Sequence, residues 1–392
     1  MHASDRPDPE ELAAWLRLAA TSGIGPAVGR RLLSVFGLPI DVFAADAASI
    51  AAACGTPAVA QALHRPDPQR ESRVERSLAW LAGAADVPRS VITLADPRYP
   101  PRLLHLADPP LLLHVEGSVQ ALSRRAIAIV GSRNATAVGA STARDLAAAL
   151  AGAGWCIVSG LAEGIDRSAH LGALDAGTHA AGTVAVMGTG IDRIYPSRHQ
   201  ALAREIARNG ALVSEQAVGT EPRPGCFPRR NRLIAALSHG VLVVEAALRS
   251  GSLITARVAA ELGRDVFAVP GSIHSPQARG CHRLIRQGAV LTETLDDIVS
   301  EFSLSIPCGI ECAPSIPSGG TRDGYDDGRR SRAGLAPPLR ALLDALDGGP
   351  SRVDALQRVL GWPVGSLLAA LQTLELDGWL GAAADGTWYV VR

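Results

Sequence analysis

Residues 126–136 have the sequence AIAIVGSRNAT. The first five are all apolar, and a glycine with a polar turn follows them at once. An apolar run of this length that stops at a turn is typical of a strand covered on both faces, as in a parallel sheet. We therefore predict a buried parallel strand at residues 126–130, with the polar turn at its carboxyl end.

Further apolar runs of strand length follow along the chain, separated by stretches long enough for helices. They lie at residues 156–159, 183–187, 211–214, 241–245 and 266–269. Strands that alternate with helices predict an α/β fold with a doubly wound, Rossmann-like sheet, which we place at about residues 123–300. Ligands bind beyond the carboxyl ends of the strands in such sheets, so the turns after these runs are the places to search for a site.

Residues 1–80 are predicted to form a small helical domain. Residues 11–63 are alanine-rich with a helical pattern, and Gly23-Ile24-Gly25-Pro26 marks a turn between two helices. Such a turn can let backbone amides approach a phosphate, as helix N-termini do, or it can simply join two helices tightly. The sequence leaves both roles open.

The chain after the predicted sheet contains a linker and a third domain. We predict an α/β core at 81–305, a flexible linker rich in Pro, Gly, Ser and Asp at 306–334, and a winged-helix domain at 335–392. The winged helix would consist of helices and a hairpin at residues 337–346, 352–360, 364–377, 378–380 and 387–391.

Composition excludes several classes of site. All 38 basic residues are arginine, so the chain has no Walker A lysine, Schiff-base lysine or catalytic lysine base. The six cysteines are scattered without CxxC pairs, which predicts reduced thiols, and Cys308 and Cys312 have no second pair with which to hold a metal. With no secretory signal and no membrane-spanning apolar run, we expect a cytoplasmic protein without membrane partner, metal or cofactor.

Glycines, hydroxyls and an arginine gather at the predicted strand ends. They are Gly131, Ser132, Arg133 and Thr136 after the first strand, and Ser159 and Gly160 after the second. Glycine permits close approach, hydroxyls and helix-start amides can donate to an oxyanion, and arginine adds a permanent forked charge. A third turn, Gly188-Thr189-Gly190, lacks the last glycine of a dinucleotide fingerprint. These turns together predict an anion site.

Residues 221–232, EPRPGCFPRRNR, place four arginines around one phenylalanine, and we interpret them as a loop. Arginines follow phosphates and an exposed aromatic ring stacks on a base, the combination expected of a site for single-stranded nucleic acid. Alternatively, Phe227 fills the core and holds the loop down, and Asn231 caps a helix that runs on through Leu237. The candidate DNA contacts in this segment are Phe227, Arg229, Arg230, Asn231 and Arg232.

Residues 250–256, SGSLITA, follow another predicted strand. Ser250, Ser252 and Thr255 would complete the anion pocket, or the segment merely caps the next helix. Residues 110–299 contain 19 Arg against 15 Asp and Glu, a net charge of +4, whereas residues 335–392 contain 4 Arg against 6 acids, a net charge of −2. The basic excess favours the α/β core over the winged helix as the DNA-binding part.

The chain resembles the DNA-processing protein A (DprA/Smf) family over nearly its whole length. The motifs that carry the resemblance are IVGSR at 129–133, SGLA at 159–162, GID at 164–166, Ala169-His170, Tyr195-Pro196, FPRRNRLI at 227–234, SGSLITA at 250–256 and AVPG at 268–271.

The resemblance implies an extended Rossmann fold between an N-terminal helical domain, SAM-like or helix-hairpin-helix-like, and a C-terminal winged helix. It implies that Gly131, Ser132, Arg133, Ser159 and Gly160 line a pocket for the DNA backbone, and that Phe227, Arg230 and Asn231 contact single-stranded DNA. Family members dimerise, load the RecA recombinase onto incoming strands, displace single-strand-binding protein and protect transforming DNA. The implied function is a recombination mediator of competence and natural transformation, without catalytic activity.

Two other functions stay open on the sequence. Rossmann-like proteins that hydrolyse nucleotides use a glycine-rich phosphate loop and a nearby carboxylate, a part that Asp166, Glu215 or Glu245 could play here. A transcriptional regulator would instead act through the winged helix, although the acidic balance of residues 335–392 argues against it.

Overall fold

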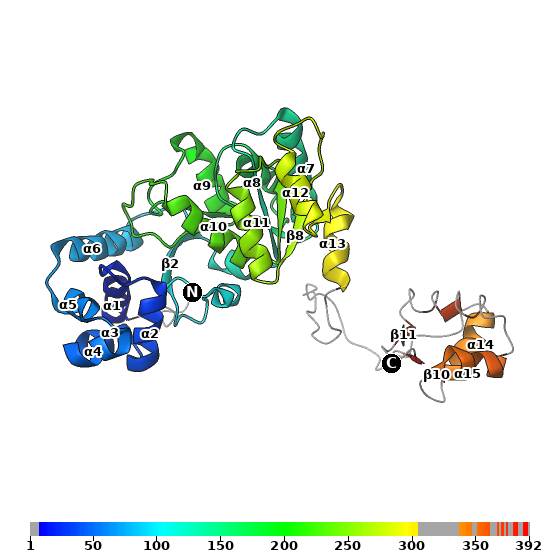
Figure 1. Ribbon diagram of the computed structural model, residues 1–392, viewed down its shortest axis with the longest axis horizontal. Helices are drawn as coiled ribbons and strands as arrows, with labels where there is room; N and C mark the ends of the chain where they lie inside the picture. Colours follow the sequence, from blue (N-terminus) through cyan, green and yellow to red (C-terminus); the bar gives the residue numbers. More distant parts are fainter. Residues whose placement is uncertain are drawn as a thin grey trace, which may run out of the picture. The chain divides into compact units, whose positions relative to one another are not determined.

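The computed structural model describes residues 8–304, 337–346, 351–360, 379–382 and 387–390, and the single positions 367, 370, 371 and 374. The chain divides into two compact units, Met1–Gly309 and Ile310–Arg392. The first contains a helical region and the large sheet (Figure 1). Most of the predicted linker, most of the predicted third helix of the winged helix, and Cys308 and Cys312 lie outside the described residues.

The first unit is built on a nine-stranded sheet with the order β1-β2-β6-β5-β4-β3-β7-β8-β9. Neighbours from β6 to β9 are parallel, whereas β1 and β2 pair antiparallel with each other and β2 pairs antiparallel with β6. The strands are β1 (Arg89–Thr93), β2 (Leu112–Gly117), β3 (Ala126–Gly131), β4 (Cys156–Ser159), β5 (Thr183–Val186), β6 (Ala211–Ser214), β7 (Gly240–Val244), β8 (Asp265–Ala268) and β9 (Val290–Leu291). The chain reverses direction across the sheet between β3 and β7, which makes their carboxyl ends the topological switch point.

Helices cover both faces of this sheet, as expected for a doubly wound fold (Figure 1). In β3, Ile127 and Ile129 pack toward one helical layer while Ala128 and Val130 pack toward the other. The first layer is α7 (Ala137–Gly152), α8 (Ile165–Asp175), α9 (Gln200–Asn209) and α13 (Leu295–Leu304). The second is α10 (Cys226–Leu237), α11 (Ser252–Glu261) and α12 (Arg279–Arg286), with the short helices η1 (Pro101–His105) and η2 (Val119–Ser123). One further short helix, η3 (Ser197–His199), precedes α9.

All six strands predicted from apolar runs are confirmed, each to within one residue at either end. The sequence prediction misses β1, β2 and β9. Both β1 and β2 carry polar or charged residues, such as Arg89, His114 and Glu116, and β9 has only two residues. Because β1 and β9 are the two edge strands, they do not need the continuous apolar run that revealed the central strands, whereas in β2 the polar His114 and Glu116 interrupt that run.

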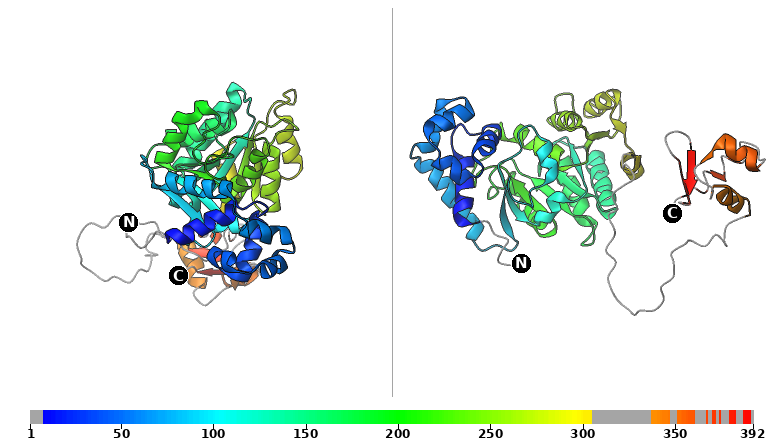
Figure 2. Two further views of the ribbon diagram at one scale, coloured as in Figure 1. Left: turned by 90° about the vertical axis from the view of Figure 1, so that its left-hand side faces the viewer. Right: turned by 90° about the horizontal axis from the view of Figure 1, so that it is seen from below.

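The helical region at the start of the chain lies at one end of the sheet, beside β1 and β2 (Figure 2). Five of its six helices begin with proline at the first position, where the missing N–H costs no hydrogen bond. The helices are α1 (Pro9–Ala20), α2 (Pro26–Phe36), α3 (Pro39–Ala44), α4 (Ala47–Cys54), α5 (Pro57–His64) and α6 (Pro68–Ala82). Their buried side chains, among them Trp15, Leu18 and Leu32, join one core with residues of β2 and α9.

In the second unit, α14 (Pro337–Leu346) and α15 (Val353–Leu360) confirm two of the predicted helices. The antiparallel pair β11 (Leu380–Ala382) and β12 (Thr387–Val390) confirms the predicted hairpin, and β10 (Ser351–Arg352) adds a third strand that was not predicted. Leucines of these elements form a core of their own. None of the helices in the described part of the chain combines the length and apolarity needed to cross a bilayer.

Candidate nucleic-acid interface

A cavity of about 770 Å³ lies at the switch point, beyond the carboxyl ends of β3 and β7. Its wall is formed chiefly by the turns after these two strands and by the first half of α10. Nine of the fourteen residues predicted for the site line it: Gly131, Ser132, Arg133, Phe227, Arg230, Asn231, Ser250, Ser252 and Thr255. The fold therefore brings three separate motifs together around this switch-point cavity.

An exposed arginine lies beside two aromatic rings in this cavity. The guanidinium carbon of Arg133 is 5.5 Å from the centre of the Phe227 ring. The Tyr195 ring, 49% exposed, has its centre 5.5 Å from that of Phe227. Phe227 is half-buried and packs against Gly188, where a Cβ would come within 2.9 Å of the ring. Such a cluster can contact a phosphate and a stacked base at the same time.

The arginine-rich segment is helical from Cys226 onward, so the loop that the sequence predicts is confined to residues 221–225 and the rest of that prediction is wrong. Helix α10 begins at Cys226 and includes Phe227, Arg229, Arg230 and Arg232. Pro228 lies in the first turn of the helix, where its missing N–H would have had no partner within the helix. A proline that looked like a loop residue is therefore compatible with the helix.

Asn231 lies inside α10 and is not its N-cap, so that alternative is also wrong. Its amide oxygen accepts from Nε of Arg230 at 3.1 Å, and its amide nitrogen donates to the carbonyl of Gly251 at 3.4 Å. Asn231 thus connects α10 to the turn that precedes α11.

Arg230, which the sequence predicts as a DNA contact, is turned into the protein. Its side chain donates to the carbonyl oxygens of Gly160 and Val186 and is 4% exposed. A Cβ on Gly160 would lie 2.1 Å from the guanidinium group, so glycine is required there to admit the arginine. Burial lowers the pKa of Arg230 to about 10 and raises that of Asp166, while the attraction between the two opposes both shifts. Arg230 remains charged at neutral pH, and its charge favours the ionised form of buried Asp166.

His170 is a fully buried neighbour whose titration gives a pH prediction. The Thr183 hydroxyl donates to Ile157 O, so it accepts from Nδ1 of His170, 2.8 Å away. Burial, with the nearby charges of Arg230 and His199, lowers the pKa of His170 to about 3. Below pH 6.5 His170 is protonated in the unfolded chain but stays neutral in the folded protein. The free energy of unfolding therefore decreases as the pH falls from 6.5 toward 3.

We expect His170→Asn to reduce this pH dependence, because the amide nitrogen can replace Nδ1 but does not titrate. The slope of unfolding free energy against pH should fall by up to about 1.4 kcal/mol per pH unit within that window. Urea titrations between pH 5 and 7 measure it. An unchanged slope would mean that His170 is protonated in the folded protein.

The other five predicted residues lie outside the cavity wall. Thr136 donates from its N–H and hydroxyl to Glu245, at 2.9 and 2.5 Å. This carboxylate therefore occupies the helix start at which the sequence predicted an oxyanion.

The other four residues are buried or engaged elsewhere. Ser159 is fully buried and donates to Ile129 O at 2.6 Å, and Gly160 is buried beneath Arg230. Arg232 forms ion pairs with Glu215 at 2.5 Å and Asp108 at 3.5 Å, and Arg229 borders a second cavity.

Several exposed residues of the cavity wall were not selected from the sequence. They are Asn134, Tyr195, Arg223 and Arg249. Three of them lie next to or within a motif of the sequence analysis: Arg223 belongs to the arginine-rich segment, Arg249 precedes Ser250, and Tyr195 belongs to Tyr195-Pro196. Tyr195 is also one of only 4 tyrosines. The scarcity of aromatic residues was the signal that could have identified Tyr195.

The three carboxylates considered for nucleotide hydrolysis are all engaged by protein groups. Asp166 accepts from the N–H groups of Gly160 and Ala162, Glu215 pairs with Arg232, and Glu245 holds Thr136. None of the three is presented free to the switch-point cavity as a general base would need to be.

Comparison with known proteins decides the family. Residues 90–303 match the family model of DNA recombination-mediator protein A, which covers more than half of the chain. This chain belongs to the DNA recombination-mediator protein A family. Residues 328–386 match the model of the DprA winged helix domain, so this family's winged helix follows the core here. The predicted family and fold class are thus confirmed.

Individual members of the family are similar over long stretches. Protein Smf of Escherichia coli (strain K12) is 40% identical over 315 residues, which is 80% of this chain and 80% of that protein. The X-ray structure of DNA processing protein A from Streptococcus pneumoniae superposes with a TM-score of 0.64 at 34% identity, covering 76% of this chain and 99% of the other. The Helicobacter pylori protein, whose structure gives insight into its single-stranded DNA binding mode, has a TM-score of 0.50 and 30% identity, covering 56% of this chain and 97% of the other.

Proposed function

We propose that this protein binds single-stranded DNA at the switch-point cavity. The observation that carries the proposal is exposed Arg133 beside the partly accessible rings of Phe227 and Tyr195, with exposed Arg223 and Arg249 on the same wall. Arginines neutralise the backbone and aromatic rings stack on bases whatever the sequence, which is the pattern of single-strand binding. The single-strand binding of the related Helicobacter pylori protein supports this proposal.

Within this proposal the predicted residues take two kinds of role. The accessible ones, Ser132, Arg133, Phe227, Asn231 and Ser250, would contact the strand, together with Tyr195, Arg223 and Arg249. The more deeply placed ones would form and support the floor, namely Gly131, Ser159, Gly160, Arg230, Arg232, Ser252 and Thr255. The exposed Thr136 binds Glu245, and the exposed Arg229 borders the second cavity. Ser252 and Thr255 are 7% and 1% exposed, so their role in this proposal is to support the cavity wall.

We further propose that the protein is a cytoplasmic, homodimeric recombination mediator that protects incoming DNA and loads RecA in natural transformation or another recombination route. The division into residues 1–80, 81–305, 306–334 and 335–392 is part of this proposal. Membership of the recombination-mediator family supports the role. Loading predicts faster RecA filament assembly on strands already coated with single-strand-binding protein, and no acceleration would reject it.

Arg133→Ala tests the proposed site. Removing one phosphate contact should weaken binding to every single-strand sequence to a similar extent, since phosphates carry no base information. The slope of log K against log salt should become shallower by about 0.7. Fluorescence anisotropy of a labelled strand, with a duplex of the same sequence alongside, measures both quantities at several salt concentrations.

Arg204→Ala is the control, because Arg204 is an exposed arginine of α9 that does not line the cavity. It should leave both the affinity and the salt slope unchanged. An unaltered slope in Arg133→Ala would remove Arg133 from the backbone contacts, and equal binding of strand and duplex by the wild type would reject the single-strand proposal.

A further inference from the structure

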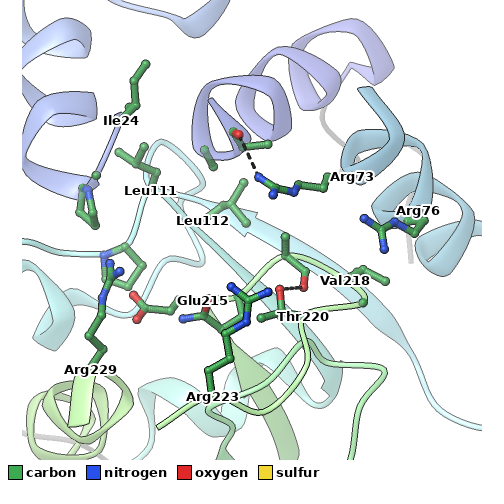
Figure 3. Close-up of a pocket in the computed structure, with 18 of the residues that line it drawn as sticks. Ile24, Arg73, Arg76, Leu111, Leu112, Glu215, Val218, Thr220, Arg223 and Arg229 are labelled. Atoms are coloured by element: carbon green, nitrogen blue, oxygen red, sulfur yellow. Dashed lines mark hydrogen bonds between the residues drawn. The ribbon is translucent and has the colours of Figure 1, made fainter. Parts of the chain in front are cut away.

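A second cavity, of about 660 Å³, lies within the first unit, where the N-terminal helical region meets the sheet and its loops (Figure 3). One side is formed by the turn between α1 and α2 and by α6, and the other by the loop after β6 and the start of α10. We call it the hairpin cavity, after the turn at Gly23–Pro26. It brings together residues that are more than a hundred positions apart in the sequence.

Four exposed arginines border the hairpin cavity. Arg73 and Arg76 approach from α6, and Arg223 and Arg229 approach from the opposite side (Figure 3). Within residues 8–304, none of the four forms an ion pair with a carboxylate. Arg73 donates to Ala20 O at 3.5 Å and Arg76 to Ser72 O at 3.2 Å, both neutral acceptors.

The two acidic residues of the wall are already paired with other arginines. Glu215 pairs with Arg232 at 2.5 Å and Glu221 with Arg193 at 3.6 Å, and neither partner belongs to the four. Arg229 lies near enough to Glu215 to favour its charged form, without a direct ion pair. The cavity therefore keeps an excess of positive charge, and guanidinium groups gathered in this way attract phosphates.

The turn at Gly23–Pro26 adds backbone donors to this charge. Gly25 is the N-cap of α2, an eleven-residue helix whose N-terminus has no side-chain cap. A Cβ at Gly23 or Gly25 would meet nothing within 4 Å, so the backbone there is open to a ligand. The first amides of a helix lack partners within the helix and favour an anion.

Arg223 lines both the hairpin cavity and the switch-point cavity, so the two share one cationic residue. We propose that the hairpin cavity is a second phosphate-binding site, which takes the backbone of the same DNA strand where it continues past Arg223. This inference rests on the proposed binding of single-stranded DNA at the switch-point cavity. It gives the Gly23–Pro26 turn a role in binding as well as in joining helices.

The test is the double variant Arg73→Ala/Arg76→Ala, because these two residues border the hairpin cavity and do not line the switch-point cavity. Anisotropy titrations would use two oligothymidylates, one of about 5 nucleotides and one of about 20. For the longer strand we expect about tenfold weaker binding and a salt slope shallower by about 1.4, which corresponds to two lost phosphate contacts. Binding of the shorter strand should be unchanged, since it would occupy the switch-point cavity alone.

Arg204→Ala/Arg208→Ala is the matched control, with the same loss of charge from two exposed positions of α9 that border neither cavity. Unchanged binding of both strands by the α6 variant would overturn the second site, as would an equal loss with both strands. In either case, weaker binding of both strands by the Arg133→Ala variant would still support the proposed function. If the wild type bound neither strand, the proposed function would fail, and the second site with it.

Discussion

Replacing Arg230 by alanine is expected to lower the free energy of unfolding by about 2–6 kcal/mol, because two buried carbonyl oxygens lose their donor at about 1–3 kcal/mol each. Arg230 is 4% exposed, its guanidinium group donates to two carbonyl oxygens, and its charge favours the ionised form of buried Asp166. Without it, two carbonyls lose their donor, and Asp166 keeps the weaker attraction of Arg133 but loses that of Arg230. Urea unfolding followed by circular dichroism measures the change.

Two matched variants give this prediction its controls. Arg229→Ala removes the adjacent arginine of the same helix, which is exposed and forms no ion pair with any residue that the structure describes, and it should change stability by less than about 0.5 kcal/mol. Arg230→Lys keeps a charge near Asp166 but lacks the forked donor geometry, so its stability should be intermediate. If Arg230→Ala unfolds like the wild type and loses only DNA binding, the side chain must leave the interior to contact DNA.

This prediction also changes how a binding defect would be interpreted. A loss of DNA affinity in Arg230→Ala is expected to follow from the damaged floor of the switch-point cavity. It would therefore not by itself identify Arg230 as a phosphate contact. Arg133, which is exposed, is the position at which affinity and stability can be separated.

Replacing Phe227 by alanine is expected to weaken single-strand binding by about 1–3 kcal/mol, or roughly 5- to 150-fold, if the ring stacks on a base. The ring is half-buried, with Tyr195 on one side and Arg133 within cation–π distance. Fluorescence anisotropy at fixed salt measures the affinity, and thermal unfolding of the same preparation measures stability.

Phe227→Tyr is the control, because it keeps an aromatic face and should retain most of the affinity. The salt slope should stay the same in Phe227→Ala, since stacking releases no counterions. A fall in melting temperature with binding intact would show that Phe227 fills a space in the core, the alternative that the sequence left open.

Much of the fold could be predicted because its signals are local. The six central parallel strands are buried on both faces, so each appears as an apolar run that neighbouring residues reveal by themselves. The edge strand β1 was missed because it needs fewer apolar side chains, and β2 was missed because His114 and Glu116 interrupt its apolar run. The motifs that resemble the family likewise depend only on residue order, and the family model confirms them.

The sequence by itself determined the family, the doubly wound sheet and the motifs that meet at its switch point. Only the tertiary structure decided what each side chain does there. Arg229 and Arg230 are adjacent and chemically identical, yet one is exposed and the other is buried against Gly160 and Asp166. The Glu245 carboxylate accepts from the first residue of the helix start that was expected to bind an anion. Arg73 and Arg76 lie across the hairpin cavity from Arg223. The direction of a side chain depends on helix phase and on partners far along the chain, and neither is visible in a local pattern.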